Sequence, residues 1–96
     1  MALLVSPAVL VKLQSKHGVA VAEVEECFAN RIGRMLYDLR ERHRTSPPTL
    51  WFIARTDSGR ELKVVFVQNG EHIQLKTAYE PSEAELRIYL HYGLAP

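Results

Sequence analysis

The chain has 96 residues, of which 47% are hydrophobic and 24% charged, and its formal net charge is +1. A chain of this length and composition can form one domain, 1–96, around a single hydrophobic core, and it is not typical of a disordered protein. The near-neutral charge excludes a general electrostatic attraction to nucleic acid. Any such affinity depends on where the charges lie.

Cysteine and histidine usage gives no sign of a disulfide framework or a metal centre. The single cysteine, Cys27, cannot form an internal disulfide, which favours a cytoplasmic location. The four histidines match no metal-binding spacing, so we expect no metal and no cofactor. The apolar N-terminus lacks a signal-peptide pattern, and no apolar run reaches the ~20 residues of a membrane span.

Two helices are predicted in the first third of the chain. Ser6-Pro7 joins an N-cap residue to the residue favoured at the first helical position, which predicts a helix over Pro7–His17 that stops at Gly18. A second helix is predicted over Val21–Ala29, with its apolar residues on one face.

The next segment, Arg34–Arg44, allows two interpretations. Either it extends the second helix or it forms a first strand. Gly33 favours the strand, because it breaks the helix, and apolar and polar residues alternate after it. As a strand, this segment would point Met35, Tyr37 and Leu39 into the core.

Two hairpins and a capped helix are predicted in the second half. The strands are Leu50–Arg55, Glu61–Val67 and Glu71–Glu80, joined by turns at Asp57-Ser58-Gly59 and Asn69-Gly70. Ser82 and Glu85 form a capping box that begins a helix over Ser82–Tyr92. Together these elements predict an α+β fold with two N-terminal helices, a four-stranded antiparallel meander and a C-terminal helix.

The turns predict which residues pair across the sheet. A three-residue first turn places Phe52 opposite Val64, and a two-residue Asn69-Gly70 turn places Phe66 opposite Ile73. One face is then apolar, and we expect its core residues to pack against both Pro7–His17 and Ser82–Tyr92. This apolar core comprises Phe52, Val64, Phe66, Ile73 and Leu75.

The other face is predicted to be basic. The same register places Lys63 directly opposite Lys76, and like charges that face each other destabilise a ladder by roughly 0.2–1 kcal/mol. If Arg34–Arg44 is a strand, Asp38 and Arg40 join these lysines and Trp51 on this face. The two lysines either remain solvated and splayed apart or meet an anion such as phosphate.

Three short motifs resemble the BrnT-like toxins. They are Lys16-His17-Gly18-Val19 before an acidic helix, Ser58-Gly59-Arg60 running into an aliphatic strand, and the pattern Glu85, Arg87, Tyr89 in the closing helix. The resemblance spans roughly Ser15 to Tyr89 and implies the RelE/ParE-like fold of type II toxin–antitoxin systems. It also implies an antitoxin-like partner and a cytoplasmic, toxin-like endoribonuclease.

Ribonuclease activity of this kind implies metal-independent transesterification, for which the sequence offers candidates. Each candidate also has a structural explanation: Arg60 closes its hairpin, His43 is a surface loop residue, Tyr79 staples the helix start, and Trp51 packs under the C-terminal helix. The proposed catalytic residues are Arg60, His43 and Tyr79. The proposed RNA- or anion-binding residues are Arg40, Lys63, Lys76 and Trp51, of which Trp51 could stack a base.

The alternative is an inactive binding module that docks an antitoxin-like or other acidic protein. It is favoured by Thr77-Ala78-Tyr79, which stands where the family carries Ser-Ala-Arg. Similar chains are also labelled as hydrolases that remove ADP-ribose from dinitrogen reductase. Those enzymes are larger, helical and built on a two-metal carboxylate centre, and the sequence contains no such acidic cluster.

Overall fold

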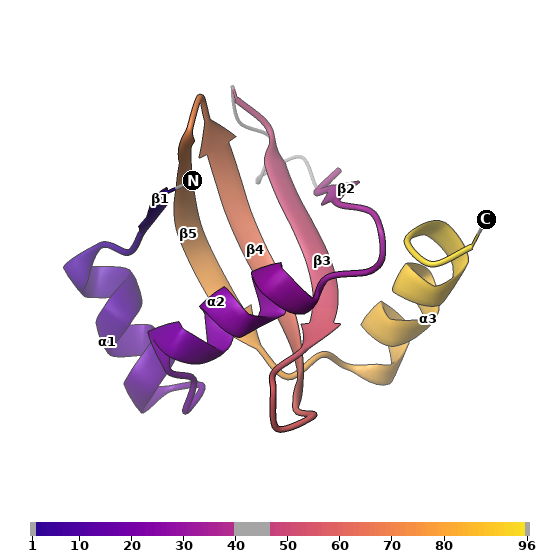
Figure 1. Cartoon of the computed structure of the whole chain (residues 1–96), viewed down its shortest axis with the longest axis horizontal. Coiled ribbons are helices and arrows are strands. Elements are labelled where there is room, and N and C mark those ends of the chain that lie inside the picture. Colours follow the sequence, from indigo (N-terminus) through magenta and orange to yellow (C-terminus); the bar gives the residue numbers. More distant parts are fainter. Residues whose placement is uncertain (1, 40–46, 96) are drawn as a thin grey trace.

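Five strands form one mixed sheet in the computed structural model, which describes residues 2–39 and 47–95 (Figure 1). The strand order is β1-β5-β4-β3-β2. The elements in chain order are β1 Ala2–Leu4, α1 Pro7–Ser15, α2 Val21–Asn30, β2 Leu36–Tyr37, β3 Thr49–Arg55, β4 Glu61–Asn69, β5 His72–Tyr79 and α3 Glu83–Tyr92.

The sheet has five strands where the sequence predicts four, and it is not wholly antiparallel. The additional strand, β1, pairs in parallel with His72–Gln74 of β5. It is only three residues long, too short to show an alternating pattern.

The core lies between the sheet and the helices α1 and α2, which cross in front of it in Figure 1. Burial of the predicted core is confirmed, since Phe52, Val64, Phe66, Ile73 and Leu75 are at most 1% exposed. Phe28 of α2 packs edge-on against Phe52 and Phe66, with ring centroids 4.9 and 5.2 Å apart.

The C-terminal helix α3 packs on the opposite face of the sheet, so its predicted contact with this core is wrong. Its one buried residue, Tyr89, packs its ring 5.7 Å from that of Trp51. The Tyr89 hydroxyl donates to the Arg34 carbonyl at 2.8 Å, which ties α3 to the segment that follows α2. A side chain at Gly33 or Gly93 would collide with the Tyr89 ring, so both positions require glycine. Because apolar residues lie on several sides of α3, the sequence pattern does not determine which side packs on the sheet.

The predicted strand Arg34–Arg44 is confirmed only in part. Between residues 34 and 39 only Leu36–Tyr37 is a strand, and residues 40–44 lie outside the described part of the chain. Tyr37 and Leu39 do not enter the core, since they are 63% and 73% exposed. β2 lies at the sheet edge beyond the cover of α1 and α2, which explains this exposure.

Of the two hairpin registers, one is confirmed and one is wrong. Phe52 pairs with Val64 as predicted, around a turn in which Gly59 has a φ of 90°. In the second hairpin Asn69 pairs with His72, so the loop is Gly70-Glu71, not Asn69-Gly70. A β-bulge then shifts the register again, with the result that Lys63 lies opposite Tyr79 and not opposite Lys76.

Candidate functional site

A buried ion pair occupies the centre of the sheet face that α3 covers. Lys63 is only 6% exposed, and its Nζ lies 2.7 Å from Oε2 of Glu85 on α3. The same ammonium lies 4.6 Å from the centre of the Trp51 ring, within the range of a cation–π contact. Trp51 and Lys63 share this face because side chains alternate along β3 and β4.

The start of α3 fixes the position of Glu85. Ser82 is the N-cap: its side chain accepts the N–H of Glu85, and its own N–H donates to Oε1 of Glu85 at 2.9 Å. This is the predicted capping box. The second oxygen of Glu85, Oε2, accepts the Tyr79 hydroxyl at 2.7 Å as well as the Lys63 ammonium. Both oxygens of the carboxylate are therefore occupied.

These contacts decide the charge of Glu85. Burial alone would raise its pKa, but the hydrogen bonds from Lys63, Ser82 and Tyr79 and the charge of Lys63 outweigh it and lower the pKa to about 2. A carboxylate with such a low pKa is a poor general base near neutral pH, because its affinity for a proton is low.

An apolar groove adjoins this ion pair, between β2 and α3. We call it the β2–α3 groove, and it is lined by Leu36, Tyr37, Leu39, Trp51, Ile88 and Tyr92. Its floor extends to Lys63, Glu85 and Asp38 in a cavity of about 530 Å³. Asp38 is 9% exposed and lies on the predicted face beside Trp51 and Lys63.

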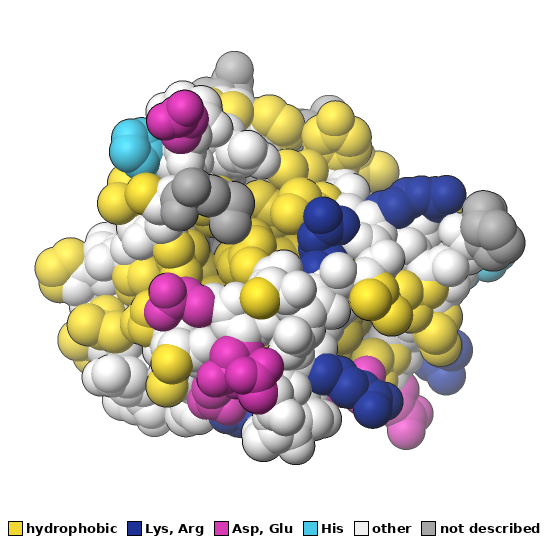
Figure 2. All heavy atoms as spheres, in the orientation of Figure 1, with side chains coloured by type: hydrophobic (Ala, Val, Ile, Leu, Met, Phe, Trp, Pro, Cys, Tyr) yellow, Lys and Arg dark blue, Asp and Glu magenta, His cyan; other side chains and the backbone are white. Residues whose placement is uncertain are grey.

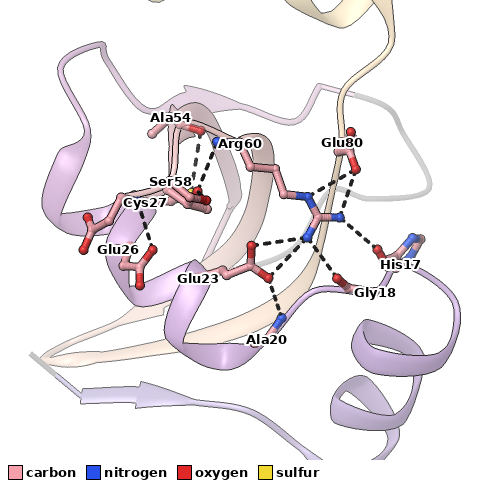
Figure 3. Close-up of polar contacts among 12 residues, drawn as sticks. His17, Gly18, Ala20, Glu23, Glu26, Cys27, Ala54, Ser58, Arg60 and Glu80 are labelled. Atoms are coloured by element: carbon pink, nitrogen blue, oxygen red, sulfur yellow. Dashed lines mark hydrogen bonds and ion pairs between the residues drawn. The ribbon is translucent and has the colours of Figure 1, made fainter.

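Arg60 lies in a separate cluster, where it joins the α1–α2 connection to the end of β5 (Figure 3). Its guanidinium donates to Glu80 at 2.9 Å and to Glu23 at 3.2 Å. It also donates to the carbonyls of Gly18 and His17, at 2.9 and 3.3 Å. These four partners lie in three segments of the chain, so the contacts of Arg60 hold those segments together and its role is structural.

The structure thus brings together three of the predicted site residues, Trp51, Lys63 and Tyr79. Arg60 takes part in the separate cluster with Glu23 and Glu80. Lys76 is exposed toward the β1 edge of the sheet, where it lines a separate pocket with Leu4 of β1 and Gln74 of β5. Arg40 and His43 lie outside the described residues.

Glu85 belongs to this candidate site, although the sequence alone did not place it there. The capping box identified it as a helix-start residue, and that role is confirmed. Its second role, as the partner of Lys63 and Tyr79, depends on the face on which α3 packs and on the bulge that moves Tyr79 opposite Lys63.

Comparisons of this chain with models of known protein families, with curated proteins and with solved structures find no match. Within residues 2–39 and 47–95, no three His, Cys, Asp or Glu side chains lie together in an arrangement that could hold a metal ion. No helix in the same part of the chain has the length and apolar character to cross a membrane.

Proposed function

We propose that this chain is a protein-binding module with a BrnT-like, RelE/ParE-like fold and not an active ribonuclease. In this proposal, an extended segment of an antitoxin-like partner docks in the β2–α3 groove. The observation that carries the proposal is an exposed, aromatic groove beside a lysine whose charge is already neutralised by Glu85.

The pairing of the candidate cations weakens the ribonuclease alternative. Stabilising the charge that develops on a phosphate requires cations that can turn to the phosphate oxygens. Lys63 is held by Glu85 and Arg60 by Glu23 and Glu80. An RNA phosphate would have to displace these carboxylates.

Exposed apolar side chains support a protein partner. Nine large hydrophobic side chains are exposed among the described residues, and four of them line the β2–α3 groove. Figure 2 shows hydrophobic side chains over α3, at the right of the view. These four are Tyr37, Leu39, Ile88 and Tyr92. Clustered apolar and aromatic side chains of this kind mark protein interfaces.

The backbone of β2 supports docking by strand addition. The N–H of Asp38 donates to the Thr49 carbonyl at 2.9 Å, and Tyr37 lies opposite Leu50. Because backbone groups alternate in direction along an antiparallel strand, the N–H and carbonyl of Tyr37 point away from β3. β2 is the last of the described strands in the sheet order, so a partner strand can pair there and place alternate side chains in the groove.

The partner segment is expected to be apolar more than acidic. The described charges of the groove floor are Asp38, Glu85 and Lys63, and they do not form a basic surface. Aromatic side chains such as Tyr37, Trp51 and Tyr92 are typical anchors of a protein interface.

Tyr37→Pro tests this mode of docking. Binding peptides would be selected from a displayed random library, and their affinities measured for wild-type protein, Tyr37→Pro and Tyr37→Ala. Both variants remove the phenol ring, but only proline removes the outward N–H. Such a proline is tolerated at an edge strand.

We expect Tyr37→Pro to bind about three- to tenfold more weakly than Tyr37→Ala, which corresponds to one lost backbone hydrogen bond. Peptides that bind both variants as tightly as they bind the wild type would show that the groove is not the docking site. A library that yields no binder would contradict the proposed function itself.

A further inference from the structure

A second apolar groove lies on the opposite flank of α3, toward the end of α2. We call it the α2–α3 groove. It encloses about 410 Å³, and its apolar wall includes Ile32, Ile53, Leu86, Leu90 and Leu94. Ile32, Leu90 and Leu94 are 89%, 59% and 41% exposed, so this flank presents aliphatic side chains to water.

The sequence of α3 explains why this flank has no cover within the described chain. Tyr89 is the only residue of α3 that is fully buried. Leu86 and Leu90 of α3, and Leu94 just after its end, follow at intervals of four and form a second apolar stripe. Around the helix axis, Leu90 is rotated by about 100° from the buried Tyr89. A helix with apolar residues on more than its buried side is suited to pack against a second helix.

Opposite charges stand at the two ends of α3, in addition to Arg55 and Glu61, which line the groove itself. Glu83 is in the first turn of α3. At the other end, the Arg34 N–H donates to the Gly93 carbonyl at 2.9 Å, and its guanidinium lies 3.4 Å from the Tyr92 carbonyl. Among the described residues, neither Glu83 nor Arg34 has an ion-pair partner.

We propose that the α2–α3 groove binds a second copy of this chain, with the two α3 helices packed antiparallel about a twofold axis. In this pairing Leu90 of each copy faces Leu86 of the other, and the axis passes near the level of Ile88. Glu83 of each copy then lies beside Arg34 of the other, since antiparallel packing brings the acidic start of one helix to the basic end of the next.

The charges at the two ends of α3 indicate that the α2–α3 groove binds a second copy of the chain. An isologous contact requires a surface that matches itself when rotated, and an acidic start with a basic end gives such a match only in the antiparallel sense. The formal net charge of +1 offers little long-range repulsion between copies. Ile88 and Tyr92 lie on the other flank, so the β2–α3 groove stays open in the dimer. The dimer is therefore independent of the proposed partner binding.

The expected dimer is weak. A helix of 10 residues is about 15 Å long, which gives an interface near the small end of the specific range. Analytical ultracentrifugation across a concentration series would show a monomer–dimer equilibrium with a Kd of roughly 10–100 µM. A single monomeric species throughout that range, or open-ended assembly beyond the dimer, would overturn the inference.

Leu90→Arg tests the apolar contact, with Val11→Arg as its matched control. Val11 is 62% exposed on α1, away from the α2–α3 groove. We expect Leu90→Arg to raise the dimer Kd at least about tenfold and Val11→Arg to leave it unchanged. Equal dimerisation of both variants would place the interface elsewhere.

Charge reversal tests the pairing without relying on stability. Glu83→Arg alone and Arg34→Glu alone each set like charges against one another, so each variant should remain monomeric. An equimolar mixture of the two should recover a heterodimer, because arginine then faces glutamate at both ends. A mixture that stays monomeric while the wild type dimerises would exclude the antiparallel register. A chain shown to be monomeric would leave the proposed partner binding standing.

Discussion

Lys63→Met is expected to lower the free energy of unfolding by about 2–3 kcal/mol near neutral pH, because it leaves the partly buried Glu85 carboxylate without its cation. The substitution also removes the cation–π contact with Trp51, whose ring centre lies 4.6 Å from the Lys63 ammonium. Chemical denaturation of the wild type and the variant measures the difference.

The acid dependence of this difference identifies Glu85 as its source. Glu85 has a folded-state pKa of about 2, below its ordinary value of 4.5, so its ionised form stabilises the fold above that ordinary value. The stabilisation is lost as the pH falls through the folded-state pKa. The deficit of Lys63→Met should therefore narrow between about pH 5 and pH 2.

Two further variants serve as controls. Lys76→Met removes an exposed lysine, and it should change stability by less than ~0.5 kcal/mol. Adding Glu85→Gln to Lys63→Met removes the unpaired charge and should recover part of the loss. A Lys63→Met deficit that is absent, or that does not change with pH, would show that the ion pair does not contribute to the stability of the fold.

Phe66→Ala is expected to cost about 3–5 kcal/mol, which is a large part of the stability of a small domain. Phe66 is fully buried, and its ring lies 5.2 Å from that of Phe28 and 6.0 Å from that of Phe52. Removing it opens a cavity between the sheet and α2.

The matched control for Phe66→Ala is Val11→Ala on the exposed side of α1, which should stay within about 0.5 kcal/mol of the wild type. Thermal and chemical unfolding of both variants provide the measurement. A Phe66→Ala variant as stable as the wild type would show that the described core is not the one that holds the domain together.

Local sequence signals predicted the parts of the fold that depend on neighbouring residues. Asp57-Ser58-Gly59 gave the correct register of β3 and β4, because Gly59 supplies the positive φ of the turn. Ser82 and Glu85 gave the correct start of α3. In each case a few adjacent residues determine the geometry.

The candidate site was harder to predict, because it depends on contacts between residues that are far apart in the sequence. The Asn69-Gly70 pair indicated a hairpin but not which two residues form its loop, and the bulge next to Phe66 has no clear sequence signal. Together these shifts replaced the predicted Lys63–Lys76 contact with Lys63 opposite Tyr79. Glu85 reaches Lys63 because α3 packs on this face of the sheet, and the turn pattern does not specify on which face α3 packs.

The sheet face bearing Lys63 is proposed to bind protein and not to cleave RNA. The direct test is incubation of purified protein with total RNA in EDTA, with RNA length followed on denaturing gels. We expect the RNA to remain intact with protein in excess, and the wild type to match Lys63→Gln, Arg60→Gln and His43→Ala. RNA cleavage by the wild type that persists in EDTA and is lost in any of these variants would contradict the claim.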